Sequence, residues 1–377
     1  MTPSPLQRAW REGARIASQY ATAVAHEARG KPLRAIGTMR QIALARLRHH
    51  VGPRYYSLFE FSRVPRDDWD DYVTDDPAFK KLLERMSPAA ARDVANDKAL
   101  FHRHCARHGL PAIPILALIS RSPRHEYANV LWTRDRRAWN EMLAQAPPSL
   151  FVKPLDGTFG EGAFTAERVN GEIRFADHQG PPEALFDYLT ARLDEQSGWL
   201  IQPRLQCHPV LAAIMSPDGI GTIRAVTCMK EGGSRLLLAI LKITVGDNVT
   251  DNFHHGSTGN LVAPIDVTSG RVSAARGSKR KDWPEMKNFS HHPETGNPIE
   301  GTIIPGWPHV VRTVLEAQES LPDLKSTGWD IAITPDGPLL VETNAYYSVD
   351  IMQVAYQRGL KRELMRELDS IAPPAER

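Results

Sequence analysis

Two acidic residues and an amide between positions 328 and 344 could together bind a metal ion. The segment GWDIAITPDGPLLVETN alternates apolar and polar residues around Pro335-Asp336-Gly337, which predicts a β-hairpin with a three-residue loop. That loop sets the pairs that face each other across the hairpin: Thr334 with Pro338, Ala332 with Leu340, and Asp330 with Glu342. Asn344 lies on the same face as the two carboxylates, because side chains alternate along a strand. Carboxylate and amide oxygens are ligands that suit Mg²⁺.

The opposed carboxylates also predict something about stability. Like charges directly opposite each other on neighbouring strands are destabilising, so the hairpin needs a compensating charge. A Mg²⁺ ion held by Asp330 and Glu342 together with substrate phosphates would supply it. We therefore expect Asp330→Asn to leave the metal-free protein at least as stable as before. A solvated polar face on an amphipathic hairpin is the alternative, and these residues alone do not decide between the two.

A glycine-rich loop that follows a short apolar strand could bind phosphate. The strand carries Lys153, and Gly157, Gly160 and Gly162 follow it. Glycines let backbone N–H groups approach an anion, and a lysine on the entering strand can neutralise its charge. The loop lacks the Gly-Lys-Ser/Thr of a P-loop, and we expect it to lie between antiparallel strands. A plain glycine-rich turn is the alternative.

Length and composition are those of a globular protein with two or three domains. The chain has 377 residues, of which 42% are hydrophobic and 24% charged. No apolar run approaches the ~20 residues of a membrane span, and no apolar secretory segment opens the sequence, so we expect a cytoplasmic location. Cys105, Cys207 and Cys228 are odd in number and far apart, which fits neither a disulfide framework nor a zinc site.

The N-terminal segment is strongly basic. Residues 1–54 carry ten Lys/Arg against Glu12 and Glu27, a net charge of +8. The remainder carries 36 Lys/Arg (46 − 10) against 42 Asp/Glu (44 − 2), a net charge of −6. A basic arm on a mildly acidic body indicates a polyanionic or membrane-surface neighbour.

Two helices are predicted in this basic segment. An apolar stripe between residues 6 and 24 predicts the first, and Leu33, Ile36, Ala43 and Leu47 begin the second, with arginines on its other sides. A helical hairpin packed on the body is one interpretation, and contact of residues 1–50 with an anionic membrane or a glycan is the other. No nucleic acid partner is expected, because no recognised binding motif is present.

The remaining periodicity predicts a mixture of helices and strands. Helices are expected at residues 77–86, 88–107, 181–193, 308–321 and 356–371. Strands are expected between the glycine loop and a turn at Asn170-Gly171, and at residues 172–175, 199–202, 221–227 and 236–245.

Three separated features resemble the ATP-grasp superfamily in their order and spacing. They are Asn96-Asp97-Lys98, Phe151-Val152-Lys153-Pro154 with its glycine loop, and Asp330 followed by Glu342-Thr343-Asn344. More closely, residues 91–355 resemble the sugar-transfer-associated ATP-grasp proteins, which are found with polysaccharide biosynthesis genes. This closer resemblance rests on Gln206-Cys207-His208-Pro209, Gly221-Thr222-Ile223-Arg224, Asp251-Asn252-Phe253-His254, Ile304-Pro305-Gly306-Trp307 and Gly328-Trp329-Asp330.

The resemblance implies a fold and a set of site residues. The fold is α+β, with two subdomains (91–200 and 201–377) sandwiching ATP and a helical extension at 1–90. Lys98 and Lys153 would contact the phosphates of ATP under a lid that contains Gly157, Thr158, Gly160 and Gly162. The remaining implied roles are adenine binding by Gln202 and Leu205, Mg²⁺ binding by Asp330, Glu342 and Asn344, and charge neutralisation during catalysis by Arg224 and Lys242.

The adenine-binding strand departs from the family pattern, which usually has a glutamate where this chain has Gln202-Pro203. A glutamine carbonyl can still accept a hydrogen bond from the adenine amino group. Pro203 has no N–H, which removes one possible backbone donor. The departure therefore bears on adenine selectivity and affinity.

The activity implied by the resemblance is an ATP- and Mg²⁺-dependent ligase. It would join a small-molecule or glycan-linked carboxylate to an amine or related nucleophile through an acylphosphate, forming ADP and phosphate. The implied setting is polysaccharide or cell-surface glycan biosynthesis, in the cytoplasm or at the inner face of the membrane. A sugar or polyol kinase and a non-catalytic nucleotide-binding module are the alternatives.

Overall fold

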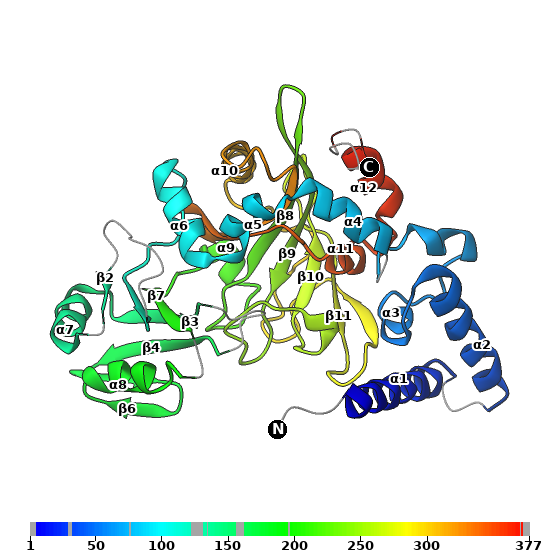
Figure 1. Cartoon of the computed structure of the whole chain (residues 1–377), viewed down its shortest axis with the longest axis horizontal. Coiled ribbons are helices and arrows are strands. Elements are labelled where there is room, and N and C mark those ends of the chain that lie inside the picture. Colours follow the sequence, from blue (N-terminus) through cyan, green and yellow to red (C-terminus); the bar gives the residue numbers. More distant parts are fainter. Residues whose placement is uncertain are drawn as a thin grey trace.

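Two seven-stranded sheets flanked by helices make up most of the molecule (Figure 1). The computed structural model describes residues 5–28, 32–74, 77–121, 131–133, 135–155, 162–194, 197–369 and 371. Neighbouring strands are antiparallel except β1 and β2. The predicted α+β class is confirmed, whereas the domain boundaries at residues 90 and 200 stay a prediction.

The first sheet has the strand order β2-β1-β7-β3-β4-β5-β6. Its strands are β1 (Ala117–Ser120), β2 (Leu131–Trp132), β3 (Ser149–Pro154), β4 (Phe164–Val169), β5 (Glu172–Phe175), β6 (His178–Gly180) and β7 (Gly198–Pro203). Helices α7 (Arg136–Gln145) and α8 (Glu183–Ala191) bury Trp139 and Leu185 against Leu150 and Val152 of β3. The predicted turn at Asn170-Gly171 is confirmed, with both residues in the left-handed region that a two-residue hairpin loop requires.

The second sheet has the order β12-β11-β10-β9-β8-β13-β14. Its strands are β8 (Thr222–Lys230), β9 (Gly233–Ile243), β10 (Leu261–Pro264), β11 (Ala275–Ser278), β12 (Met286–Phe289), β13 (Ser326–Thr334) and β14 (Gly337–Asn344). Apolar residues alternate between its two faces. Ile223 packs in one core with α10 (Trp307–Glu319), and Val226 packs in another with α11 (Val349–Tyr356) and α12 (Lys361–Asp369).

The hairpin of β13 and β14 differs from the predicted one in its loop. Pro335 and Asp336 alone connect the strands, so Thr334 pairs with Gly337 and Ala332 with Leu339. A β-bulge then places one extra residue, Val341, in β14. The bulge offsets the shorter loop, and the predicted pairing of Asp330 with Glu342 is confirmed.

One of the predicted helices is divided. The chain forms α4 (Pro77–Met86) as predicted, but residues 88–107 form α5 (Ala89–Asn96) and α6 (Lys98–Arg107). Asp97 separates them because its backbone is extended and its carboxylate accepts hydrogen bonds from the N–H groups of Ala99 and Leu100 at 2.8 and 3.0 Å. The helix predicted at residues 356–371 forms as α12 and begins only at Lys361, because Gln357 in the left-handed region ends the preceding α11, which was not predicted.

The N-terminal extension is a pair of helices at one end of the molecule, α1 (Pro5–Ala28) and α2 (Pro32–His49) (Figure 1). Ala23, Ile42 and Ala45 are fully buried in the core that also contains the β8 residue Val226, so the extension packs on the body. A short helix, α3 (Pro53–Leu58), joins the same core. Within the described residues, no helix is both long and apolar enough to span a bilayer.

Candidate active site

A cleft of about 450 Å³ draws its walls from both sheets and from α6. Nine of the thirteen predicted site residues line it: Lys98, Lys153, Gln202, Leu205, Arg224, Lys242, Asp330, Glu342 and Asn344. Three others, Gly157, Thr158 and Gly160, lie outside the described residues. These nine residues come from seven helices and strands and from the loop after β7, and their positions span more than half of the sequence. The fold of the chain therefore brings them together.

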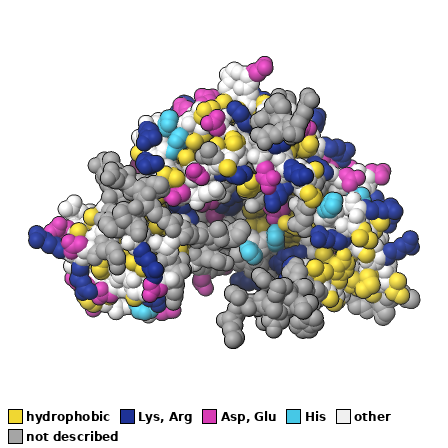
Figure 2. Space-filling model, in the orientation of Figure 1, with side chains coloured by type: hydrophobic (Ala, Val, Ile, Leu, Met, Phe, Trp, Pro, Cys, Tyr) yellow, Lys and Arg dark blue, Asp and Glu magenta, His cyan; other side chains and the backbone are white. Residues whose placement is uncertain are grey.

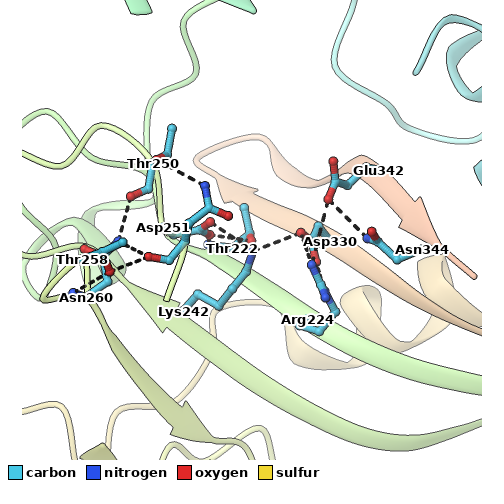
Figure 3. A network of polar contacts seen from close by, with 11 residues as sticks. Thr222, Arg224, Lys242, Thr250, Asp251, Thr258, Asn260, Asp330, Glu342 and Asn344 are labelled. Carbon is cyan, nitrogen blue, oxygen red and sulfur yellow. Dashed lines mark hydrogen bonds and ion pairs between the residues drawn. The ribbon is translucent and has the colours of Figure 1, made fainter. Parts of the chain in front are cut away.

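Asp330 is the centre of a buried charge cluster in this cleft (Figure 3). Arg224, opposite it on β8, makes a two-pronged contact: Nε and Nη2 both donate to the Asp330 carboxylate, the latter at 2.8 Å. The ammonium group of Lys242, from β9, donates to Asp330 Oδ2 at 3.0 Å. Three adjacent strands thus hold one carboxylate between two cations.

The electrostatics of the cluster follow from these contacts. Burial by itself would raise the pKa of Asp330, but the charges and hydrogen bonds of Arg224 and Lys242 outweigh it and hold that pKa well below its usual range. Burial would lower the pKa of Lys242, but the charges of Asp251 and Asp330 outweigh it and raise that pKa. Asp330 and Lys242 are therefore both ionised at neutral pH.

Asp251 is a cleft residue to which the sequence analysis gave no role. Its Oδ1 accepts from Lys242 at 3.0 Å, and its Oδ2 accepts from the backbone N–H and the hydroxyl of Thr222 at 2.7 and 2.6 Å. These bonds fix Lys242 between two carboxylates. The sequence evidence for a role of Asp251 was the segment Asp251-Asn252-Phe253-His254, which contributed to the family resemblance. That segment does not show which side chain Asp251 would contact.

The structure corrects the prediction that a metal ion must offset Asp330 and Glu342. Arg224 and Lys242 already compensate Asp330, so the metal-free hairpin has no unbalanced pair of carboxylates. Glu342 is the more accessible acid, with a side chain 36% exposed, and the Asn344 amide donates to it at 3.2 Å. Arg224 Nη2 lies 3.9 Å from the Glu342 carboxylate, beyond hydrogen-bonding distance.

The donor set still fits Mg²⁺. Glu342 offers carboxylate oxygens, Asn344 offers an amide oxygen, and each Asp330 oxygen has more than one lone pair. No group of three or more His, Cys, Asp or Glu side chains suited to a metal occurs in the part of the chain that the structure describes. Mg²⁺ commonly binds through one or two carboxylates and completes its shell with water and substrate phosphates, which these few ligands permit.

Lys153 and Lys98 bring positive charge to the cleft from the first sheet and from α6. Lys153, on β3, is 9% exposed, and Lys98 donates to the carbonyl oxygen of Leu155 at 3.0 Å. Burial, opposed by the charge of Glu342 and aided by that of Lys98, lowers the pKa of Lys153 to about 8. A phosphate group in the cleft would favour the charged form of this lysine.

The lowered pKa of Lys153 gives a pH prediction. We expect the affinity for ATP to fall as pH rises through about 8, because Lys153 loses its proton there and no longer attracts phosphate. Nucleotide binding measured by calorimetry from about pH 7 to about pH 9.5 would show this. Lys153→Arg, which stays charged over that range, is the control and should flatten the profile. Equal pH profiles for the two proteins would contradict the prediction.

Gln202, on β7, has hydrogen-bond partners that bear on the departure from glutamate. It is 1% exposed, and its amide nitrogen donates to the Ile113 carbonyl at 3.3 Å and lies 3.3 Å from Nε2 of His102. Burial and the charge of Lys153 lower the pKa of His102 to about 3, so this ring is neutral and can accept. With the amide nitrogen directed to these partners, the carbonyl oxygen of Gln202 is the group suited to accept from an adenine amino group.

The glycine loop connects β3 and β4, which pair in antiparallel fashion as predicted. Of its predicted lid residues the structure describes Gly162, which has a φ of +73°. A Cβ there would approach the Pro154 ring to 3.1 Å, so both conformation and space favour glycine. The next residue, Ala163, lines the cleft, which places this end of the loop beside it.

Tyr346 is a second cleft residue that the sequence analysis missed. Its ring is 41% exposed, and Arg92 of α5 donates to its hydroxyl at 2.8 Å. Tyr346 follows Asn344 by two residues, which was the only sequence signal for it. An exposed aromatic ring beside a guanidinium can contact both an apolar surface and an anionic group of a substrate.

Comparison with known proteins gives one family. The sequence model of the sugar-transfer-associated ATP-grasp proteins matches residues 79–369. No curated protein matches the chain.

Among solved structures, the chain is similar to the D-cycloserine synthetase DcsG, with 13% identity, 84% of this chain and 82% of that one covered, and a TM-score of 0.41. An L-amino acid ligase from Bacillus licheniformis has 13% identity, coverage of 76% and 53%, and a TM-score of 0.38. The biotin carboxylase domain of a Hydrogenobacter thermophilus 2-oxoglutarate carboxylase, solved with MgADP and bicarbonate, has 13% identity, coverage of 74% and 49%, and a TM-score of 0.38. The chain spans about half the length of the last two.

Proposed function

The chain belongs to the sugar-transfer-associated ATP-grasp family, and from that premise we propose that it is an ATP- and Mg²⁺-dependent ligase. Its fold is the α+β ATP-grasp fold with a helical N-terminal extension. The proposed reaction joins a carboxylate to an amine or related nucleophile through an acylphosphate and forms ADP and phosphate. The observation that carries the proposal is the cleft, in which cations from both sheets lie beside the acidic hairpin.

Nucleotide binding is assigned to the first sheet, to α6 and to the glycine-rich loop that follows β3 in the sequence. Lys98 and Lys153 neutralise the phosphates, and the lid containing Gly157, Thr158, Gly160 and Gly162 covers them and excludes water. The carbonyl oxygen of Gln202 and the neighbouring residue Leu205 receive the adenine. Support for this orientation comes from the hydrogen bonds that direct the Gln202 amide nitrogen away to Ile113 and His102.

The acidic hairpin is assigned to the metal. Glu342, Asn344 and Asp330 would hold Mg²⁺ together with phosphate oxygens of the nucleotide. The chemistry that the metal supplies is neutralisation of the charge that develops on the phosphates during transfer.

Arg224 and Lys242 are assigned to the reacting groups. Lys242 has three N–H donors, of which Asp251 and Asp330 take two, so the third can bind a phosphoryl or carboxylate oxygen. Its orientation is set before the substrate arrives, which is the arrangement that best stabilises a transition state. Arg224, held by Asp330, adds fixed positive charge on the acceptor side of the same cleft.

The proposed reaction has two steps. A carboxylate oxygen of the substrate attacks the γ-phosphorus, and the bond from that phosphorus to the bridging oxygen breaks, which releases ADP. The amine nitrogen then attacks the acyl carbon of the acylphosphate, and the bond from that carbon to the phosphate-bearing oxygen breaks. Phosphate leaves, and the amine loses a proton to solvent. The proposed substrates are small-molecule or glycan-linked carboxylates and amines in polysaccharide or cell-surface glycan biosynthesis.

The proposed function is tested by product analysis. The protein is incubated with ATP, Mg²⁺, hydroxylamine and pooled carboxylates, and nucleotides and hydroxamates are measured by mass spectrometry. We expect ADP, together with a hydroxamate formed when hydroxylamine attacks the acylphosphate. AMP would overturn the proposal. ADP with a stable phosphorylated sugar, obtained with a sugar pool and without a hydroxamate, would instead support a kinase.

The proposed place of action is the cytoplasm, at the inner face of the membrane. The +8 charge of residues 1–54 supports this location, because the inner leaflet of a membrane carries negative charge. The acceptor or donor would then be presented at that surface, within reach of a protein bound to it.

A further inference from the structure

Helix α2 exposes the three most solvent-accessible large apolar side chains among the described residues. Leu47 is 81% exposed, Ile36 is 78% exposed and Met39 is 53% exposed. The sequence stripe that contains Ile36 and Leu47 therefore does not pack on the body. Ile42 and Ala45, which have no exposed surface, make that contact instead.

The three side chains share one face of the helix. With about 100° of rotation per residue, Ile36, Met39 and Leu47 fall within an arc of about 80°. The buried Ile42 and Ala45 point to the other side. Isolated exposed apolar residues are ordinary on a protein surface, but a row of them over three turns of one helix indicates a contact surface.

Arginines border this apolar face. Arg40 and Arg46 are both exposed, and the helical rotation places one on each side of the row. The face belongs to the segment whose net charge is +8. Figure 2 shows hydrophobic side chains gathered over the α1–α2 end of the molecule, with Lys and Arg beside them.

We infer that this face of α2 binds an anionic lipid bilayer, with Ile36, Met39 and Leu47 entering between the headgroups and Arg40 and Arg46 at the lipid phosphates. An apolar row with basic flanks is the pattern of helices that lie in the membrane interface. Cationic side chains near the surface add attraction to anionic lipids. This inference deepens the membrane location of the proposed function and names the surface that makes the contact.

A second copy of the chain is the other partner that an apolar face could bind. A symmetric dimer through α2 would place two segments of +8 against each other. Charge repulsion opposes that association, whereas the negative surface of a bilayer attracts the same segment. Charge complementarity therefore favours an anionic bilayer over a second copy of the chain as the partner of this face.

The test replaces the apolar row without changing charge. The triple variant Ile36→Gln, Met39→Gln, Leu47→Gln keeps good helix formers on the surface, and Ile303→Gln, at an apolar residue 44% exposed outside the extension, is the matched control. Binding is measured by flotation with vesicles of phosphatidylcholine alone or mixed with phosphatidylglycerol. We expect the unaltered protein and the control to bind the anionic vesicles only, and the triple variant to bind them roughly tenfold more weakly or worse.

Other outcomes would overturn the inference. Equal binding of the triple variant and the unaltered protein would mean that charge alone makes the contact. Dimers that dissociate in the triple variant, seen by sedimentation, would assign the face to a second copy. Hydrogen exchange of the unaltered protein is an independent measurement. The backbone amides of α2 should exchange more slowly when anionic vesicles are present. ATP turnover in solution should be unchanged in the triple variant, so failure of this inference is distinguishable from failure of the proposed ligase.

Discussion

Asp330→Asn should abolish ATP turnover and also destabilise the metal-free protein, by about 3–5 kcal/mol, which is the usual effect of removing one partner from a buried ion pair. Asp330 is 4% exposed and is the common partner of Arg224 and Lys242. Asparagine is nearly the same size but neutral, so both cations would keep their burial and lose a counter-charge. Urea unfolding of both proteins without nucleotide measures the difference directly.

Glu342→Gln is the matched control for this result. The Glu342 side chain is 36% exposed and Arg224 Nη2 lies 3.9 Å from its carboxylate, so its neutral variant should change unfolding free energy by less than about 0.5 kcal/mol. It should nonetheless weaken Mg²⁺-dependent nucleotide binding. If Asp330→Asn is instead as stable as the native protein, Arg224 and Lys242 do not offset the charge of Asp330, and only a metal ion could do so.

Acid should remove the stabilisation by Asp330. Its pKa is lowered in the folded protein, so its contribution is complete above the ordinary value of about 3.9 and is lost as pH falls toward the lowered value. The difference in stability between the native protein and Asp330→Asn should therefore shrink below about pH 4.

Lys153→Met should show the opposite combination, with activity lost and stability kept. The pKa of about 8 means that the fold disfavours the charged form of Lys153, so a methionine of similar volume should be tolerated or be stabilising. Turnover should fall by roughly 100-fold to 1,000-fold, which is typical when a preorganised charge at a transition state is removed. The loss should appear more in kcat than in KM.

Steady-state kinetics and thermal unfolding of the same preparation measure both effects. Lys153→Arg retains a positive charge and should keep more activity than Lys153→Met. An activity loss in Lys153→Met smaller than about tenfold would remove Lys153 from the phosphate site. A large loss of stability would show that its charge serves the fold instead.

The acidic hairpin shows what alternation in a sequence can predict. The alternation of side chains along each strand correctly predicted that Asp330, Glu342 and Asn344 share the cleft side, although the predicted loop length was wrong. A loop of two residues shifts the register by one, and the bulge at Val341 shifts it back. Bulges have no strong local sequence signal, so only the pairing at the functional end of the hairpin could be predicted.

The charge cluster could not be predicted because its members come from different elements. Arg224 and Lys242 meet Asp330 only through the order of β9, β8 and β13 in the sheet, and Asp251 joins the cluster through its bond to Lys242. The contacts therefore depend on topology, which no local pattern reports. The same limitation applies to α2, where the apolar stripe was visible but the side that packs on the body was not.

Oxygen transfer from the substrate tests the acylphosphate most directly. Once a carboxylate substrate is found, it is labelled with ¹⁸O in its carboxyl group, and the phosphate formed during turnover with the amine is examined by mass spectrometry. The mechanism predicts one ¹⁸O atom in each phosphate, because the carboxylate oxygen that attacks the γ-phosphorus leaves with it. Unlabelled phosphate, or label found in AMP, would contradict the account.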